Sequence, residues 1–382
     1  MSTPRATARV DAAAIRHNVA ELRGRVASGQ LLAVVKADGY GHGLLTAATA
    51  ALAGGAQWLG TALLQEALEL RAAGLTEPRV VAWLLDPDDD WDAALRADVD
   101  LSANDPATVA AVARAAERTG RPARLHLKID TGLGRAGSPA DRWADLVDAA
   151  LRAQADGLLQ VVGLWSHLAY ADAPHHPTTD RQIEAFRAAV DTAERAGARP
   201  EVRHLANSAA TLTRPDAHFD LVRPGLAVYG LSPIPDQADS AALGLRPAMT
   251  LTARLGLVKR VPAGQGVSYL HRYTTQRRTT LGLVPLGYAD GIPRNATNVG
   301  PVLAAGARRT IAGTVCMDQF MLDLGDDAAR VGDEVVLFGP GDDGEPTAED
   351  WARATGTISY EIVTRLGPRL PRVVVGADRI AG

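Results

Sequence analysis

Eight short apolar runs alternate with amphipathic segments in the first part of the chain. The segments between the runs, such as 105–118 and 180–196, carry apolar residues at helical spacing, and Asp11 is placed to cap the first of them. Eight strand and helix units across about 220 residues are typical of a parallel (β/α)₈ TIM barrel. The predicted strands are 31–35, 58–61, 80–84, 99–102, 125–129, 161–166, 202–206 and 219–222.

The pattern changes around residues 236–244. From Pro247 the runs are short, β-branched and separated by Gly and Pro turns, as in MTLTARLGLVKRV, TTLGLVPLG, RTIAGTV, FMLDL and DEVVLFG. They indicate a mostly β domain, with a helical stretch over 348–365 and a last strand over 372–375. We therefore predict an α/β barrel over 11–240 and a C-terminal β domain over 241–382. Residues 1–10 are expected to pair with the β domain.

Composition narrows the class of protein. A chain of 382 residues is too long for a single ordinary domain core. Its content of 47% hydrophobic and 22% charged residues is that of a globular enzyme. A net charge of −4 argues against a nucleic-acid partner. Cys316 is the only cysteine, no run approaches the ~20 apolar residues of a membrane span, and MSTPRATARVD lacks a signal-peptide core. The expectation is a cytoplasmic enzyme that does not bind membranes.

Lys36 follows the first predicted strand, in LLAVVKADGYGHG (31–43). At the mouth of a hydrophobic strand an ammonium group is partly desolvated, and its pKa falls toward the neutral amine. A neutral amine can form a Schiff base with an aldehyde cofactor and later carry a proton. The alternative is a solvated lysine that closes a strand, which is the commoner case for a lone lysine.

Polar residues also follow four other predicted strands, and the carboxyl ends of barrel strands converge on one face. At or just past the end of each strand lie Lys128, Asp130 and Arg135 for 125–129, Ser166 and His167 for 161–166, His204, Asn207 and Ser208 for 202–206, and Arg223, with the apolar Gly225 and Leu226, for 219–222. The loops after the last two strands commonly hold phosphate. A phosphate at Ser208 and Gly225 with Lys36 across the mouth is what pyridoxal phosphate (PLP) needs.

Each of these residues also has a simpler interpretation. Arg135 and Arg223 taken alone would pass for surface charges, and His167 and His204 for hydrogen-bonded core histidines. The Asn-Ser pair at 207–208 is a good helix cap, which is compatible with phosphate binding.

Two further patterns are weak. His175 and His176 are adjacent, but no HExxH or CxxC spacing accompanies them, so no metal site is expected. The sequence GYGHG (39–43) lacks the acidic partner of a dinucleotide site, and the chain has no Walker sequence.

Taken together, the motifs resemble those of alanine racemases, fold-type III PLP-dependent enzymes, of the actinobacterial type. The resemblance spans essentially the whole chain and rests on AVVKADGYGHG, KIDTGLGRAG, WSHLA, HLANSAA, VRPGLAVYG, GVSY, GYADGIPR, GTVCMDQF and TISYEI. It implies a homodimer that interconverts L- and D-alanine and supplies D-alanine for peptidoglycan.

The resemblance also implies roles for matching positions. Lys36 would hold the cofactor and act as base on one face of the substrate, and Tyr269 of the partner subunit would be the base on the other face. Arg223 would face the pyridine nitrogen, with His167 beside the ring and linked to Tyr269. The phosphate would be surrounded by Tyr40, Ser208, Gly225, Leu226 and Tyr360, with Asn207 in support. Arg135 and the backbone of Met317, also from across the interface, would meet the substrate carboxylate, Lys128 would be a carbamylation candidate bracing Arg135, and Tyr288 and Arg294 would line the entrance.

The chemistry is consistent with this set. Inverting an α-carbon requires one group to remove a proton and a second group to deliver one to the opposite face. Tyrosine has a reference pKa of ~10 and needs a positive neighbourhood to act as a base. Arg223 is a donor only, so a ring nitrogen that faces it must stay unprotonated and is a poorer electron sink.

Two positions depart from the family pattern. Leu270 follows Tyr269 where the family usually has Gly, which would alter the loop beside the second base. Asp38 replaces the more frequent Asn in the lysine motif, with little expected consequence.

Other functions remain open from the sequence. The nearest is a serine or broader-specificity racemase on the same scaffold, although a broad-range relative would be expected to carry an export signal. An aldolase or decarboxylase would lack the Tyr269 arrangement, and a non-catalytic PLP carrier would resemble only the barrel. A sugar-phosphate barrel enzyme without a cofactor would be colourless.

Overall fold

The eight predicted barrel strands form one parallel sheet, in the order β8-β7-β6-β5-β4-β3-β2-β9. Their bounds are β2 Gln30–Val34, β3 Trp58–Thr61, β4 Arg79–Ala82, β5 Asp100–Ala103, β6 Ala123–Lys128, β7 Leu159–Trp165, β8 Val202–His204 and β9 Leu221–Val222. Two backbone hydrogen bonds, from Asp220 N to Arg203 O and from Arg223 N to Ala206 O, join the last strand to β8 and complete the circle. The computed structural model describes residues 4–26 and 29–377.

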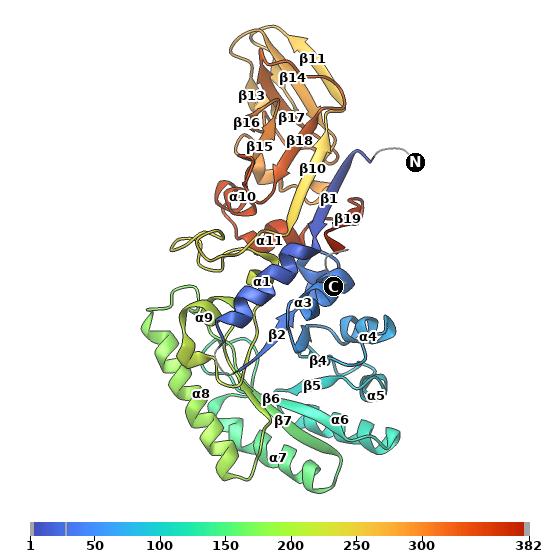
Figure 1. Ribbon diagram of the computed structural model, residues 1–382, viewed down its shortest axis with the longest axis vertical. Helices are drawn as coiled ribbons and strands as arrows, with labels where there is room; N and C mark the ends of the chain where they lie inside the picture. Colours follow the sequence, from blue (N-terminus) through green and yellow to red (C-terminus); the bar gives the residue numbers. More distant parts are fainter. Residues whose placement is uncertain (1–3, 27–28, 378–382) are drawn as a thin grey trace.

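Helices cover the outside of this sheet (Figure 1). The α-helices are α1 Ala12–Gly24, α2 Lys36–Tyr40, α3 Leu44–Ala53, α4 Leu64–Ala72, α5 Trp91–Arg96, α6 Pro106–Thr119, α7 Trp143–Ala155, α8 Pro177–Arg195 and α9 Ser208–Thr213, and the 3₁₀ turns are η1 Ala140–Arg142, η2 Pro215–Ala217 and η3 Leu226–Tyr229. The barrel of the fold-class prediction is therefore confirmed.

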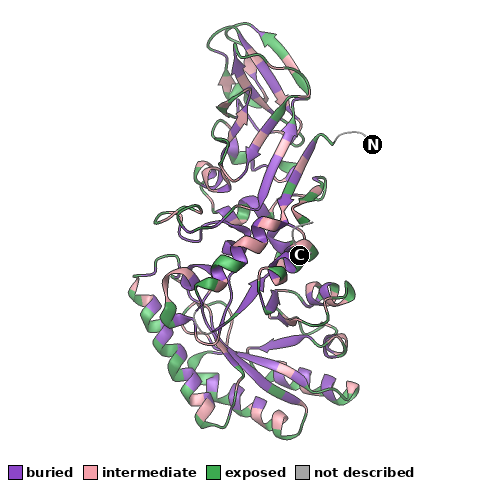
Figure 2. Ribbon diagram, in the orientation of Figure 1, coloured by how far each residue is buried: buried purple, intermediate pink, exposed green. Residues whose placement is uncertain are grey.

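Local sequence explains where these helices begin and which face they bury. The Asp11 carboxylate accepts the N–H of Ala13 at 2.9 Å, as an N-cap should. In α8, Ile183, Phe186 and Val190 are buried at the spacing of one helical face. Figure 2 shows the result, with buried strands inside and exposed outer surfaces on the helices.

The C-terminal part of the chain forms β sheets. The larger sheet has the strand order β16-β15-β18-β10-β1-β19, a second sheet has β11-β14-β17, and β12 pairs with β13. The bounds are β1 Ala6–Asp11, β10 Met249–Arg254, β11 Leu257–Val261, β12 Gly266–Val267, β13 Tyr273–Thr274, β14 Thr279–Val284, β15 Pro301–Ala304, β16 Ala307–Thr310, β17 Phe320–Gly325, β18 Glu334–Phe338 and β19 Arg372–Val375. The short helices are η4 Tyr269–His271, η5 Tyr288–Asp290, η6 Arg294–Ala296, α10 Ala348–Thr355 and α11 Ser359–Thr364.

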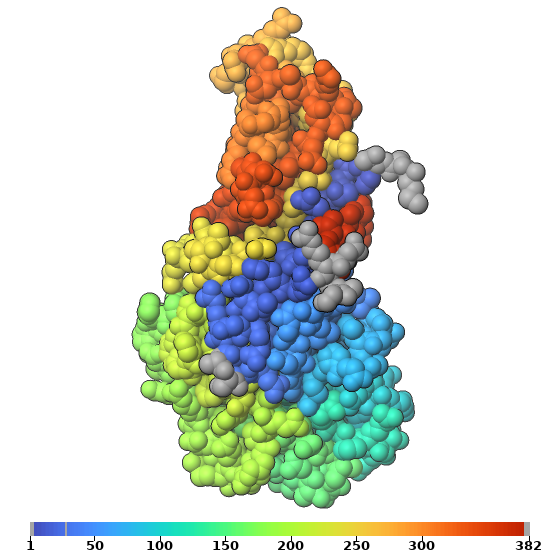
Figure 3. All heavy atoms as spheres, viewed as in Figure 1, coloured from blue at the N-terminus to red at the C-terminus, as the bar shows by residue number. Residues whose placement is uncertain are grey.

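The N-terminal strand crosses between the two parts of the chain. β1 pairs antiparallel with β10 and parallel with β19, so it belongs to the larger C-terminal sheet, as expected from its sequence. It leads directly into α1 of the barrel. One hydrophobic cluster includes barrel residues such as Leu32 and sheet residues such as Leu251, so the two parts share a continuous core. In the space-filling view the C-terminal sheets form one end of the molecule and the barrel forms the other (Figure 3).

Three details differ from the sequence-based expectations. The run MTLTARLGLVKRV is two strands, β10 and β11, in different sheets, because the chain turns at Leu255 and Gly256. The stretch 348–365 is two helices separated by Gly356, whose φ of +68° ends α10. Strands β12, β13 and β15 lie in segments where no strand was predicted.

Candidate active site

The short element α2 after β2 is a left-handed turn rather than a regular α-helix. Ala37, Asp38, Gly39 and Tyr40 all have φ between +53° and +60°. This conformation costs roughly 1–2 kcal/mol for each non-glycine residue, so it needs support from its surroundings. Glu66 Oε1 accepts the N–H of Ala37 at 2.6 Å, and Asp38 Oδ1 accepts the N–H of Leu44 at 2.8 Å. Aspartate tolerates this region almost as asparagine does, so the departure at position 38 leaves the turn intact.

The turn places Lys36 at the mouth of the barrel beside other cations. Burial, followed by the charge of Arg135, lowers the pKa of Lys36, while Glu66 opposes the shift. Burial, Arg223 and Arg135 lower the pKa of Lys128 to about 8, and its Nζ lies 4.2 Å from the Trp165 ring centroid. Both amines therefore lose their protons more readily than a solvated lysine does.

Arg223 lies buried at the end of the last barrel strand. Its Nη2 donates to Ser166 O at 2.8 Å and to His167 Nδ1 at 3.5 Å, and its Nη1 donates to His204 Nδ1 at 3.1 Å. Burial lowers the pKa of Arg223 to about 9, so the group is still a cation at neutral pH. Burial and then Arg223 hold the pKa of His167 well below its ordinary value, so this imidazole is neutral.

A second group of residues lies beside the Lys36 turn rather than across the mouth from it, because Gly225 follows β9, the neighbour of β2 in the sheet. Ser208 Oγ accepts the N–H of Gly225 at 2.8 Å, and a Cβ added to Gly225 would collide with the Tyr40 hydroxyl. Burial is the main cause that raises the pKa of Tyr40, and it raises the pKa of Tyr360 to about 12. Both phenols therefore stay protonated and can donate hydrogen bonds. Asn207 caps α9 by accepting the N–H of Ala210 at 3.1 Å.

These groups line a single cavity of about 760 Å³. The predicted site residues among its lining are Lys36, Tyr40, Lys128, Arg135, His167, Asn207, Ser208, Arg223, Gly225, Leu226 and Tyr360. Asp130 does not line this cavity; its carboxylate accepts the N–H groups of Gly132 and Leu133 and shapes the loop that carries Arg135.

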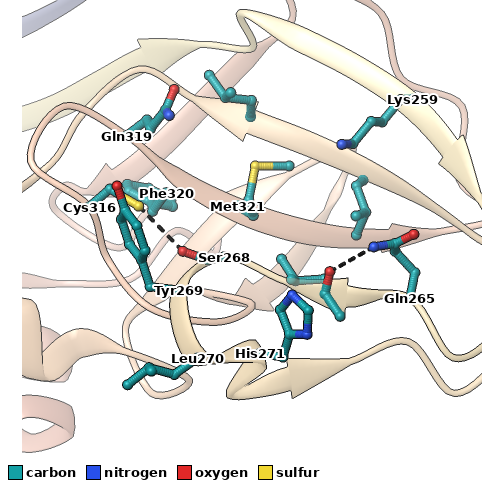
Figure 4. A pocket seen from close by; sticks show the side chains of 14 residues that line it. Lys259, Gln265, Ser268, Tyr269, Leu270, His271, Cys316, Gln319, Phe320 and Met321 are labelled. Atoms are coloured by element: carbon teal, nitrogen blue, oxygen red, sulfur yellow. Dashed lines mark hydrogen bonds between the residues drawn. The ribbon is translucent and has the colours of Figure 1, made fainter.

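Four predicted residues lie elsewhere, in 3₁₀ turns and a loop of the C-terminal part of the chain. Tyr269, Met317 and Tyr288 are 69%, 54% and 44% exposed, and Arg294 is also exposed. Tyr269 lines a separate surface cavity of about 600 Å³ with Cys316 and Phe320 (Figure 4). Within one chain, the structure does not bring these residues to the barrel mouth.

The loop that carries Tyr269 is itself unusual. Ser268, Leu270 and His271 have φ of +60°, +62° and +43°, and Leu270 is 76% exposed. Leu270 thus keeps a left-handed conformation that glycine adopts freely, which is a physical reason for the family preference at this position. Hydrogen bonds from Ser268 Oγ to Thr314 O and from Thr314 Oγ1 to Tyr269 O hold the loop in place.

His175 and His176 lie at the N-terminus of α8. His176 Nδ1 accepts the N–H of Thr178 at 3.2 Å as the cap of α8, and its ring stacks on Tyr170. Among residues 4–26 and 29–377, no group of three or more His, Cys, Asp or Glu side chains is arranged to hold a metal ion. Within the same residues, no helix has the length and apolar character needed to cross a bilayer.

Several cavity residues were not predicted from the sequence. Trp83, Trp165 and Thr364 also line the mouth, and Trp165 packs against both Lys128 and Arg223. Trp165 is the last residue of β7, so its place at a strand end was the available signal. Thr364 lies in α11, and nothing local in the sequence indicates that this helix reaches the barrel.

Comparisons with known proteins agree with this geometry. Residues 10–233 match the family model described as "Alanine racemase, N-terminal domain" and residues 248–374 match "Alanine racemase, C-terminal domain". The alanine racemase of Frankia casuarinae is 62% identical over 368 residues, which cover 96% of each chain. The crystal structure of alanine racemase from Streptomyces lavendulae has a TM-score of 0.97 at 55% identity and 98% coverage of both chains. The alanine racemase structure from Streptomyces coelicolor has a TM-score of 0.96 at 58% identity, covering 97% of this chain and 98% of that one. The chain therefore belongs to the alanine racemase family, whose members are isomerases acting on amino acids.

Proposed function

We propose that the protein is a PLP-dependent alanine racemase that interconverts L- and D-alanine with two bases. The observation that carries the proposal is the convergence of Lys36, Arg223 and the Ser208–Gly225 pair in one cavity at the barrel mouth. PLP has an aldehyde, a pyridine ring and a phosphate. A lysine with a lowered pKa suits the aldehyde, a buried guanidinium suits the ring, and a cluster of hydrogen-bond donors suits the phosphate.

The residues present fit PLP. The collision that a Cβ at Gly225 would make with Tyr40 marks a cradle that only glycine leaves open. Around it, Tyr40, Ser208, Gly225, Leu226 and Tyr360 would surround the phosphate, with Asn207 in support. Lys36 Nζ would hold the aldehyde, and Arg223 would face the pyridine nitrogen with His167 beside the ring. When bound, PLP supplies an electron sink for the charge that develops at the α-carbon.

The protein supplies the proton carriers. With its pKa lowered by burial, Lys36 is an amine that can take the α-proton from one face. Tyr269 of the partner subunit would donate a proton from the opposite face, so that one removal and one delivery invert the carbon. Arg223 has donors but no acceptor, so it would leave a ring nitrogen that faces it unprotonated and would favour return of the proton over side reactions.

Substrate binding would involve both subunits. Arg135 and the backbone of the partner's Met317 would meet the substrate carboxylate, and the partner's Tyr288 and Arg294 would line the entrance. Lys128 would brace Arg135 and is a candidate for carbamylation, since a pKa of about 8 leaves part of it as a neutral amine at neutral pH. The exposure of Tyr269 and Met317 in the single chain supports their contribution across a homodimer interface.

The wider assignments rest on the same proposal. We place the enzyme in the cytoplasm, where it would supply D-alanine for peptidoglycan. The domain boundaries, 11–240 for the PLP-binding barrel and 1–10 with 241–382 for the β domain, stay a prediction. Residues 1–3 and 378–382 of that β domain lie outside the described part of the chain.

The test is borohydride reduction of the purified protein followed by peptide mapping, together with racemisation assays. We expect one PLP adduct, on Lys36, and faster turnover of L-alanine than of L-serine or larger amino acids. An adduct on another lysine, or no adduct, would contradict the cofactor assignment. Faster turnover of serine or of several larger amino acids would instead favour the serine or broader-specificity racemase.

A further inference from the structure

Strand β6 places three ionisable side chains on the inner face of the barrel. Arg124, His126 and Lys128 alternate along it with apolar residues, at the two-residue period of one strand face. Lys128 lines the mouth and Arg124 binds Asp100 near the opposite end, so His126 lies between them. The interior of such barrels is usually filled by branched apolar side chains, and a buried histidine there calls for an explanation.

His126 is part of a buried hydrogen-bonded chain that ends at the mouth. Its Nε2 lies 3.2 Å from Asp100 Oδ2 and its Nδ1 lies 3.0 Å from His204 Nε2. His204 Nδ1 in turn accepts from Arg223 Nη1 at 3.1 Å. All four side chains are buried, so no bulk water replaces any of these bonds.

Asp100 and Arg223, the two ends of this hydrogen-bonded series, each have a fixed hydrogen-bonding role. Asp100 also receives Arg79 Nη2 and Arg124 Nε, each at 2.5 Å. Burial opposes ionisation, but hydrogen bonds from His126 and Arg79 leave the pKa of Asp100 below its ordinary value. An ionised carboxylate only accepts hydrogen bonds, whereas the guanidinium of Arg223 only donates them.

These two ends allow one arrangement of protons. His126 must donate from Nε2 to Asp100, and His204 Nδ1 must be bare to accept from Arg223. The remaining proton, between the two rings, lies on His204 Nε2, because placing it on His126 would create an imidazolium beside an imidazolate. Both rings are therefore neutral with the proton on Nε2, and burial, Arg223 and His126 keep the pKa of His204 well below its ordinary value.

Packing holds the two rings in this orientation. Gly163 of β7 is the register partner of His126, and a Cβ at Gly163 would overlap the imidazole ring. The Trp165 ring stacks on His204 with centroids 5.6 Å apart and an interplanar angle of 1°. A small residue on one strand and a flat ring on the same strand thus make room for this histidine pair.

We propose that Asp100 and His126 are positioning residues that fix the tautomer of His204 and thereby hold Arg223 in place at the barrel mouth, where it would face the pyridine nitrogen. Neither residue lines the cavity, so they act through His204 rather than on the substrate. The inference rests on the proposed function, because it assigns a role at the cofactor ring to Arg223. It adds a connection from the far rim of the barrel, where Arg79 also binds Glu201, to the mouth.

The first test is ¹⁵N-histidine NMR of the wild-type protein, with and without PLP. We expect His126 and His204 each to show one protonated nitrogen, Nε2, and one bare nitrogen, Nδ1, in both forms. A doubly protonated ring, or an Nδ1–H tautomer, at either position overturns the proposal. This measurement needs no racemase activity, so its outcome is independent of whether the protein acts on alanine.

The second test replaces His126 with Phe, which keeps a ring and removes both hydrogen bonds. We expect the ¹⁵N signal of His204 Nε2 to shift, because this N–H loses its acceptor on His126. We also expect the Kd for PLP to rise ~10-fold and kcat to fall while KM changes less, as is typical when the outer partner of a functional histidine is lost. Gly163→Ala should produce the same spectral change, because its methyl group would displace the His126 ring without removing any polar group. Unchanged His204 signals and PLP affinity in both folded variants would overturn the proposal.

The matched control is His218→Gln. His218 is also buried, but its Nε2 forms a hydrogen bond with Thr211 O and takes no part in the hydrogen-bonded series from Asp100 to Arg223. We expect His218→Gln to leave the His126 and His204 signals and the PLP affinity unchanged. If it shifts them as much as His126→Phe does, the effect is a general response to core substitution and the proposal fails. If the wild-type protein shows the expected tautomers but neither binds PLP nor racemises alanine, the proposed function fails instead.

Discussion

The barrel mouth and the loop that carries Tyr269 hold their side chains in different ways. At the mouth, Lys36 is half-buried, and burial together with the charge of Arg135 lowers its pKa. Arg223 is buried and hydrogen-bonded, and burial lowers its pKa. In the loop, Tyr269 and Leu270 project into solvent from a backbone with three left-handed non-glycine residues.

The difference indicates a division of labour. A buried set of donors and amines can hold and orient a cofactor without help, because its geometry is fixed by strand ends and by close packing. The exposed Tyr269 hydroxyl, on a strained loop, forms no hydrogen bond with the described part of its own chain. Under the proposed function, Tyr269 acts as a base only when this loop lies against the barrel mouth of a second copy. Backbone strain such as that of the loop is tolerated where function requires it.

The strongest test of this division separates the two halves into different chains. Lys36→Ala and Tyr269→Ala should each lower racemisation by ~10²–10⁴-fold, since each removes one acid/base group. Mixing the two variants should restore about a quarter of wild-type activity per chain, because half of randomly formed dimers are mixed and each has one intact site. Racemisation rate and native mass spectrometry of the mixture are the measurements.

The control for that mixture is Lys36→Ala combined with the Lys36→Ala, Tyr269→Ala double variant, in which no intact site can form. Absence of rescue in the first mixture, with mixed dimers detected, would mean that both bases come from one chain.

A smaller effect is expected from filling the cradle at the mouth. Gly225→Ala puts a methyl group against the Tyr40 hydroxyl, so Tyr40 must move. Overpacking of this kind costs about 1–3 kcal/mol of stability, and we expect PLP affinity to fall ~10-fold or more. Gly24→Ala is the matched control, because nothing lies within 4 Å of that position at the end of α1. Thermal unfolding and PLP titration report both quantities; wild-type PLP affinity in Gly225→Ala would exclude a phosphate cradle here.

The smallest effect should come from Leu270→Gly in the Tyr269 loop. Glycine removes the strain of a φ of +62° but adds freedom to the unfolded chain, so the free energy of unfolding should change by less than about 1 kcal/mol. Ala305→Gly, at a φ of +49° in the β15–β16 turn, gives the same exchange away from the site. We expect both variants to unfold near the wild-type temperature and to keep kcat within about threefold. A tenfold loss of kcat in Leu270→Gly alone would assign a direct role to the leucine side chain.

Much of the barrel could be predicted because its signals are local. The strand β3 and the final strand β19 have the bounds that the sequence indicated, and the Asp11 cap forms as expected. The polar residues at strand ends meet in one cavity because parallel barrel strands all end on the same face.

The C-terminal sheets were predicted less well. One apolar run became β10 and β11 in separate sheets, since a turn at Leu255 and Gly256 looks locally like a continuing strand. Thr364 reaches the mouth only because α11 packs beside the Lys36 turn, a contact between residues more than 300 positions apart. Pattern in a short window carries no information about such contacts.

The sequence by itself determined the barrel, the lysine at its first strand end and the polar groups that surround it, because hydrophobic period and strand-end position are properties of neighbouring residues. Only the tertiary structure decided that His126 and Asp100 connect to Arg223 and that Tyr269 lies on a separate, exposed surface. These features depend on which strands face each other across the barrel and on how two domains pack. Both are set by burial of apolar surface over the whole chain rather than by any single segment.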